Sequence, residues 1–86
     1  MKNINNDVFY RFEPNIDNGI LIVFFKKSNK IYELTKPYYI FLKCIENLED
    51  NFDDVFLAEY PNLSVDEIRE SIRFIEEKLI KIGVLL

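Results

Sequence analysis

The chain has 86 residues and a formal net charge of −4 at pH 7; 49% of its residues are hydrophobic and 30% are charged. This balance is typical of one folded domain over residues 1–86 and excludes a disordered chain. With no His, one Cys and two Gly, the sequence contains no disulfide pair, no zinc ligand set and no glycine-rich phosphate loop. We therefore expect no cofactor and no metal.

The absence of His also removes the usual general base at neutral pH, which argues against an enzyme. Cys44 neighbours the apolar positions of a predicted helix, and we expect it to be a buried structural thiol. No apolar run approaches the roughly 20 residues of a membrane span, and residues 1–7 lack the apolar core of a signal peptide. The sequence therefore predicts a cytoplasmic, non-catalytic domain without membrane contact, and a flexible segment at residues 1–7.

Charge is distributed unevenly along the chain. Residues 1–45 hold seven basic and four acidic residues, a net +3, whereas residues 46–77 hold two basic and eleven acidic residues, a net −9. The lysine cluster Lys26, Lys27 and Lys30 is either an ordinary solvated surface or a local attraction for an acidic peptide. Because DNA-binding domains concentrate Lys and Arg on the element that meets phosphate, this distribution argues against nucleic-acid binding.

The first half of the chain has the patterns of three β-strands. Residues 8–13 alternate as in a half-buried strand, and residues 20–25 are six consecutive apolar residues, mostly β-branched or aromatic. Residues 27–30 predict a tight turn with Asn29 at positive φ, and residues 30–34 follow as the third strand. The short links predict an antiparallel meander with residues 20–25 in the middle.

The first two helices of the second half are predicted from caps and spacing. Thr35 and Pro37 are suited to the cap and first turn of a helix. Its apolar positions follow a spacing of three and four residues as far as Leu48. Residues 52–60 predict a short second helix that ends before Pro61.

The third helix has the clearest pattern in the chain. Ser64 and Glu67 have the spacing of a capping box. Apolar residues at intervals of four and three form one face: Ile68, Ile72, Ile75, Leu79 and Ile82. Gly83 is expected to end the helix, and we expect the apolar residues 84–86 to fold back onto the core.

Three short strands followed by three helices predict an α+β fold, winged-helix-like in content. The hairpin within residues 19–35, the helix within residues 41–51 and the long last helix with its apolar end, residues 66–85, together resemble the PqqD-like family of RiPP precursor peptide recognition elements. Thr35 stands where that family usually has Asn. Asn51 stands where Gly is usual, and Asn tolerates the same left-handed conformation.

The resemblance implies a non-catalytic role in natural product biosynthesis. Such domains bind the leader segment of a ribosomally synthesised precursor peptide and present it to a modifying enzyme. Standalone members serve separate enzymes, such as a radical SAM enzyme, a leader peptidase or a cyclase. The leader adds as a β-strand to the edge of the third strand and lies against the last helix.

Strand addition requires an unpaired edge with exposed N–H and C=O groups. An edge without Pro is predicted at Lys30, Ile31, Tyr32, Glu33 and Leu34. The alternative is that the charges of Lys30 and Glu33 protect this edge and that Tyr32 and Leu34 only belong to the core. One flank of the last helix is expected to line the adjoining groove, and the helical wheel leaves two open. We favour the flank of Ser71, Phe74 and Lys78 over that of Arg69, Arg73 and Ile80, because an off-stripe Phe is costly to leave in water. The alternative is that Phe74 packs under the C-terminal tail.

The strand at residues 20–25 is apolar on both faces, which suggests that something covers the face turned away from the helices. The N-terminal segment, a partner enzyme or a second copy in a homodimer through the sheet are the alternatives. Two other functions remain open at this point: a winged-helix nucleic-acid-binding domain, and a structural or dimerising accessory subunit of an enzyme.

Overall fold

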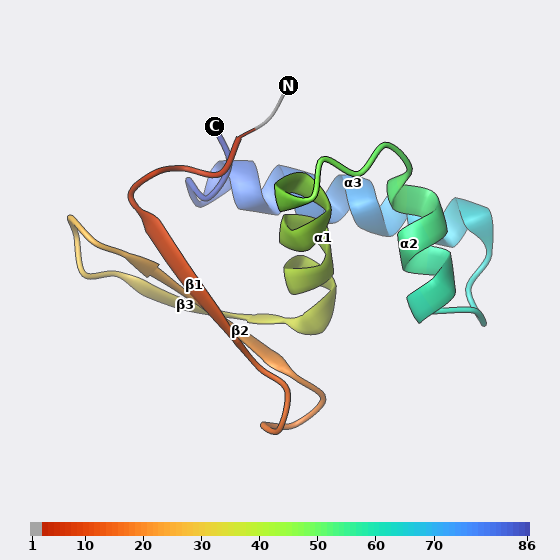
Figure 1. Cartoon of the computed structure of the whole chain (residues 1–86), viewed down its shortest axis with the longest axis horizontal. Coiled ribbons are helices and arrows are strands. Elements are labelled where there is room, and N and C mark those ends of the chain that lie inside the picture. Colours follow the sequence, from red (N-terminus) through yellow and green to blue (C-terminus); the bar gives the residue numbers. More distant parts are fainter. Residues whose placement is uncertain (1–2) are drawn as a thin grey trace.

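The computed structural model describes residues 3–86, which form an α+β arrangement with the sheet first and the helices after it (Figure 1). The three strands and three helices occur in the predicted order. Their bounds are β1 Val8–Glu13, β2 Ile20–Phe25, β3 Ile31–Thr35, α1 Lys36–Glu46, α2 Phe52–Glu59 and α3 Val65–Lys81. The prediction of a three-stranded antiparallel sheet followed by three helices is confirmed.

The strand order in the sheet is β1-β2-β3, with β2 in the middle. Both pairings are antiparallel, and their register places Phe9 opposite Phe24 and Phe24 opposite Ile31. Asn29, in the turn between β2 and β3, has φ of 59°, as the sequence predicts. The order leaves β1 and β3 as the two edges of the sheet.

The helices lie together on one side of the sheet, where α1 packs on β2 and β3, and α3 packs on α1 and α2 (Figure 1). Alternate residues of β2 face this side: Leu21 and Val23 are fully buried, and Phe25 is 8% exposed. Burying such side chains is worth roughly 1.5–3 kcal/mol each, so the core forms between this face and the helices. Other residues of this core are Leu34, Tyr38, Phe41, Leu42, Phe56, Ile68, Ile75, Leu79, Val84 and Leu85.

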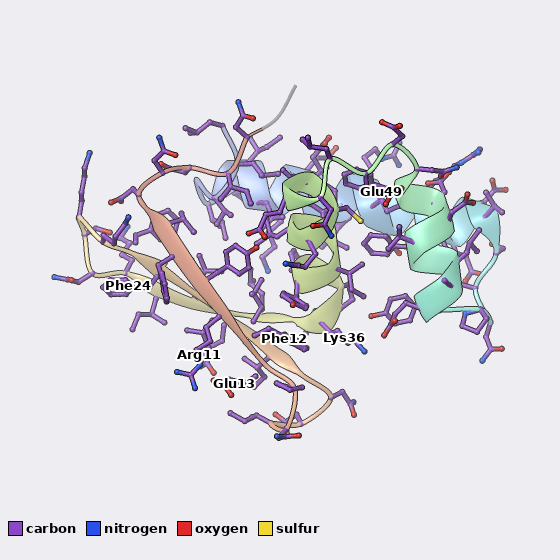
Figure 2. The ribbon with its side chains drawn as sticks, viewed as in Figure 1. Arg11, Phe12, Glu13, Phe24, Lys36 and Glu49 are labelled. Carbon is purple, nitrogen blue, oxygen red and sulfur yellow. The ribbon has the colours of Figure 1, made fainter. Side chains whose placement is uncertain are left out.

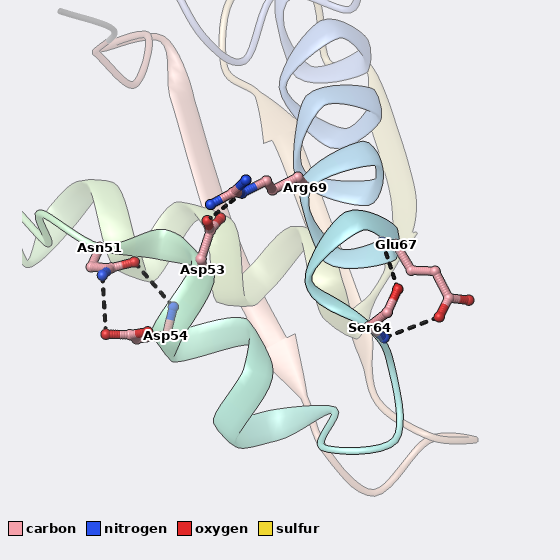
Figure 3. Close-up of polar contacts among 6 residues, drawn as sticks. All are labelled: Asn51, Asp53, Asp54, Ser64, Glu67 and Arg69. Carbon is pink, nitrogen blue, oxygen red and sulfur yellow. Dashed lines mark hydrogen bonds and ion pairs between the residues drawn. The ribbon is translucent and has the colours of Figure 1, made fainter.

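The N-termini of α2 and α3 are capped by side chains (Figure 3). At α3 the predicted capping box is complete: the Ser64 hydroxyl accepts from the Glu67 N–H at 3.1 Å, and the Glu67 carboxylate accepts from the Ser64 N–H at 3.0 Å. At α2, Asn51 accepts from the Asp54 N–H at 3.2 Å. Arg69 of α3 donates to Asp53 of α2 at 2.9 Å, which joins the two helices.

The end of α1 differs from the prediction. The helix stops at Glu46, and Leu48 has φ of 53° and is 78% exposed, so it does not extend the apolar face. The Leu48 N–H donates to the Ile45 carbonyl at 3.1 Å, and this closes the helix. The left-handed residue is therefore Leu48, whereas Asn51 has φ of −124° and serves as the N-cap of α2.

The two described ends of the chain lie side by side (Figure 1). Ile4 bridges Leu85, and the Asn5 N–H donates to the Val84 carbonyl at 2.8 Å. The C-terminal tail folds back as predicted, with Val84 and Leu85 buried. Of the segment 1–7, which the sequence predicts to be flexible, residues 3–5 pair with this tail, Asp7 accepts hydrogen bonds from the Lys26 and Lys27 N–H groups, and residues 1–2 lie outside the described range. Across residues 3–86, no helix combines the length and apolar character needed to cross a membrane.

Candidate functional site

The outer edge of β3 is unpaired by any other segment within residues 3–86. The Phe25 N–H donates toward β3, to the Lys30 carbonyl, and the Lys26 N–H donates toward β1, to the Asp7 carbonyl. Because backbone groups alternate in direction along an antiparallel strand, Tyr32 and Leu34 exchange their hydrogen bonds with β2. The N–H and C=O groups of Ile31 and Glu33 therefore point to the open edge.

The side chains of the predicted edge residues point to opposite faces of the sheet. Leu34 is 8% exposed and belongs to the core, and Tyr32 is half-buried against Phe25 with ring centroids 5.7 Å apart. Ile31 and Glu33 are exposed on the other face, and Lys30 is exposed at the turn. Leu34 and Tyr32 can therefore contribute to this edge mainly by setting the position of its backbone.

A groove of about 570 Å³ lies between the end of β3, the start of α1 and one flank of α3. Ser71 and Phe74 line it from α3, and Thr35 lines it from β3. Phe74 is 63% exposed, although exposure of an aromatic ring to water is unfavourable. This is the flank favoured from the sequence, and the alternative that Phe74 packs under the C-terminal tail is excluded because the ring is exposed.

Lys78 lies beyond Phe74 on the same flank. The two residues line a second hollow of about 370 Å³, and the Lys78 ammonium lies 5.6 Å from the centre of the Tyr38 ring. Phe74 therefore separates two hollows, with Ser71 on one side and Lys78 on the other. The structure brings these three residues together, and it brings them to the end of β3 at Thr35 rather than alongside Lys30 to Glu33.

The opposite flank of α3 has a different environment. Arg69 is engaged with Asp53 of α2, and Ile80 is 41% exposed without lining either of the hollows that Phe74 lines. This flank is therefore directed partly toward α2 and away from the end of β3.

The two ends of β3 differ in charge. Lys26, Lys27 and Lys30 are all exposed at the turn before β3. At the other end the groove is lined by Glu67 and Glu70. Hydrogen bonds donated by the Ser64 backbone and hydroxyl groups lower the pKa of Glu67, so this carboxylate stays ionised at neutral pH. The edge thus runs from a basic end to an acidic end.

Six groove residues were not predicted as part of the site. Glu67, Glu70 and Ile75 are on α3, and the other three lie where β3 meets α1: Thr35, Pro37 and Tyr38. From the sequence, Thr35 and Pro37 are predicted only as the start of a helix, and Tyr38 only as one of the apolar positions of that helix. The available signal was position, because α1 begins directly where β3 ends and its first turn must lie beside the end of that edge. Burial raises the pKa of the Tyr38 hydroxyl, so it remains a neutral group.

The groups gathered at this site can form hydrogen bonds, apolar contacts and ion pairs. Backbone donors and acceptors of β3, an exposed aromatic ring and charged groups at both ends can hold an extended peptide. Cys44 lies elsewhere, in α1, and is 3% exposed. Its burial, and to a lesser extent the charge of Glu49, raise the pKa of the thiol and disfavour the reactive thiolate.

Comparisons of the chain with models of protein families, with curated proteins and with solved structures found no match.

Proposed function

We propose that the chain is a non-catalytic peptide-binding module that holds an extended segment of a precursor peptide by β-strand addition to β3. The observation that carries the proposal is the unpaired edge of β3, which ends at a groove containing the exposed ring of Phe74. In line with the resemblance to PqqD-like recognition elements, the bound segment is the leader of a ribosomally synthesised peptide. The module delivers it, in the cytoplasm, to a modifying enzyme.

The edge supplies affinity that does not depend on sequence. An incoming strand forms hydrogen bonds with the N–H and C=O groups of Ile31 and Glu33, as a fourth strand of the sheet. Each such bond contributes on the order of 1 kcal/mol net. These groups are already held in an extended conformation by the pairing with β2, so little ordering of the module is required.

The ends of the edge supply specificity. Lys26, Lys27 and Lys30 favour acidic residues in the part of the peptide near the turn. At the other end, an apolar side chain covers Phe74 and a basic one lies near Glu67 or Glu70. We therefore expect bound peptides to be acidic at one end and apolar or basic at the other. The acidic residues of α3 make the same surface unfavourable for a nucleic acid.

The test begins with peptides selected on the immobilised chain from a random library displayed on phage. A length of about 12 residues spans β3 and the groove at ~3.3 Å per residue. The affinity of a selected, fluorescein-labelled peptide is then measured by anisotropy for the wild type, Ile31→Pro and Ile31→Ala. Proline removes the edge N–H, whereas alanine removes the same exposed side chain and keeps the N–H.

We expect Ile31→Pro to weaken binding at least about tenfold and Ile31→Ala to weaken it less than about threefold. The Ile31 N–H does not point to β2, so both variants should keep the sheet, which circular dichroism and amide NMR spectra check. Equal affinities of a folded Ile31→Pro and of Ile31→Ala would show that the peptide binds elsewhere.

A further inference from the structure

The face of the sheet turned away from the helices carries nine side chains in three rows. The register aligns Phe9, Phe24 and Ile31 in the first row, Arg11, Ile22 and Glu33 in the second, and Glu13, Ile20 and Thr35 in the third. Figure 2 shows Arg11 and Glu13 leaving β1 on the side opposite Phe12, whose ring points toward α1. One column of this face is fully apolar, and one complete row is apolar as well.

Residues 3–86 do not cover this face. Phe9 of β1 is 63% exposed and Ile31 of β3 is 61% exposed, and the two residues lie on either side of Phe24. The helices pack on the other face, and residues 3–5 pair with the C-terminal tail rather than with the sheet. Exposed apolar side chains gathered on one flat surface are typical of a protein–protein contact.

The arrangement of charge on the face identifies the partner that fits. Arg11 of β1 and Glu33 of β3 lie at the same level, on either side of Ile22. Within the chain Arg11 forms an ion pair with Glu13 of the same strand, so in a dimer its guanidinium would be shared between Glu13 and the Glu33 of the other copy. A two-fold axis that runs along β2, between two sheets packed face to face, places β1 of each copy over β3 of the other. Each Arg11 then meets the Glu33 of the other copy, and Ile22 meets its own counterpart at the centre.

The same operation also matches the apolar residues. Phe9 of each copy lies over Ile31 of the other, and the two Phe24 rings meet near the axis. The alternative two-fold axis, across the strands, would set Arg11 against Arg11 and Glu33 against Glu33, with Phe9 over Glu13. Like charges directly opposed are unfavourable, so the charges select the first axis and reject the second.

The dimensions of the face suit a contact between two sheets. Packed sheets lie ~10 Å apart with strands rotated by about 30°, so the axis would lie within about 15° of β2. Long side chains such as Arg11 and Glu33 span that gap. With strands ~4.8 Å apart, the face is about 15 Å wide and about 20 Å long. A face of this size covers about 300 Å² on each copy, so the dimer would bury roughly 600 Å² of planar area, which is below the range of stable specific interfaces and suits a weak association.

We propose that two copies of this chain associate through this face as a two-fold symmetric β-sandwich, with Ile22 at its centre and two reciprocal Arg11–Glu33 pairs. Interfaces of this size are typical of weak or transient association, so we expect a dissociation constant on the order of micromolar or weaker. Packing through the face leaves the edge of β3 open, because the edge groups point within the plane of the sheet. The dimer therefore presents two edges, and its existence does not depend on what binds to them.

The first test compares two phenylalanines of equal exposure by analytical ultracentrifugation without peptide, up to about 1 mM chain. Phe9 lies on the proposed interface and Phe74 lies on α3, and each is 63% exposed. We expect Phe9→Ser to weaken the dimer at least about tenfold and Phe74→Ser to leave it unchanged. In the peptide assay we expect the opposite: Phe74→Ser should weaken binding more than Phe9→Ser. Failure of the dimer and failure of the peptide site would therefore be seen in different assays.

The second test exchanges the charges. Arg11→Glu and Glu33→Arg each place like charges opposite one another twice in the dimer, and each should weaken association at least about tenfold. The double variant restores opposite charges across the axis and should return to within about threefold of the wild type. A wild type that is monomeric at about 1 mM overturns the proposal. So does a dimer that withstands Phe9→Ser, or a double variant that is no better than the single ones.

Discussion

The two faces of β2 have almost the same composition and different environments. Leu21 and Val23, on the inner face, are fully buried, whereas Ile22 and Phe24, on the outer face, are only partly buried. The difference arises from what lies above each face, since the helices cover one face and nothing within residues 3–86 covers the other. A strand that is hydrophobic on both faces therefore serves two purposes: one face builds the core and the other is available for assembly.

The neighbouring strands show which face is which. On the inner face β1 contributes Tyr10 and Phe12 beside the core, and on the outer face it contributes Phe9 and Arg11. The charged Arg11 beside Ile22 is compatible with a solvent-exposed or intermolecular surface and incompatible with a closed core. The following predictions test the contrast between the two faces, beginning with the largest expected effect.

Truncation of one residue on each face measures the contrast directly. Leu21→Ala should lower the free energy of unfolding by about 3 kcal/mol, because it leaves a cavity between the sheet and α1. Ile22→Ala, one residue along the same strand, should lower it by about 1 kcal/mol or less, since its side chain is already partly in water. Urea unfolding of dilute protein, followed by circular dichroism, provides both values. Equal losses would mean that the outer face is as closed as the inner one.

Gly19 tests how tightly the inner face is packed at the start of β2. Its φ is 105°, and a Cβ atom there would lie 2.6 Å from the Phe12 ring, which stacks on Tyr39 with centroids 4.2 Å apart. Gly19→Ala should therefore destabilise the fold by about 2–3 kcal/mol. Gly83→Ala is the matched control: its φ is 90°, but its Cβ would lie 3.7 Å from Phe25. The control should cost less, and an equal thermal shift for both variants would exclude the clash.

The capping box of α3 tests a smaller, solvent-exposed interaction. Ser64→Ala removes the acceptor of the Glu67 N–H and should lower the free energy of unfolding by about 1 kcal/mol. Ser64→Asp keeps an acceptor at the cap and should retain most of the stability. A Ser64→Ala variant with wild-type stability would show that the packing of α3 alone decides where the helix begins.

The same capping box predicts how the free energy of unfolding changes with pH. Hydrogen bonds from Ser64 lower the pKa of Glu67 in the folded state. Its stabilisation is therefore complete above the pKa of the unfolded carboxyl and is lost as the pH falls through the lower folded pKa. The urea midpoints of wild type and Glu67→Gln should differ near pH 7 and converge toward about pH 3. A difference that grows in acid would contradict this assignment.

The reactivity of Cys44 measures how often the core opens, and no mutation is needed for this measurement. The thiol is 3% exposed and burial raises its pKa, so reaction with a thiol reagent near pH 8 should be slow in the native state and rapid in urea. Leu21→Ala should speed the reaction by favouring opening of the core, and Ile22→Ala should leave the rate nearly unchanged. Rapid labelling of the native wild type would contradict the burial of this side chain.

Local signals predicted most of the elements of this fold. The capping box at Ser64, the left-handed turn residue Asn29 and the helix stop at Gly83 were all read from neighbouring residues, and all are confirmed. Leu48 was predicted incorrectly, because the spacing of apolar residues continues past the point where the backbone turns. The pairing of Ile4 with Leu85 had no local signal, since the two residues are 81 positions apart.

The candidate site was predicted in part. The edge position of β3 followed from the short links of the meander, and the position of Phe74 off the apolar stripe followed from the helical wheel. The wheel left two flanks of α3 open. The structure places Phe74 beside Thr35 and Arg69 beside Asp53, because the way α3 crosses α1 and α2 decides which flank meets the end of β3.

The sequence by itself determined the order of the elements, the central position of β2 and the chemistry carried by each face, because these depend on residue spacing within short segments. Only the tertiary structure decided which face of β2 the helices cover, where the groove beside β3 opens, and that Arg11, Ile22 and Glu33 share one row. These features depend on register and on packing between segments that are distant along the chain, and side-chain periodicity within one segment carries no information about either.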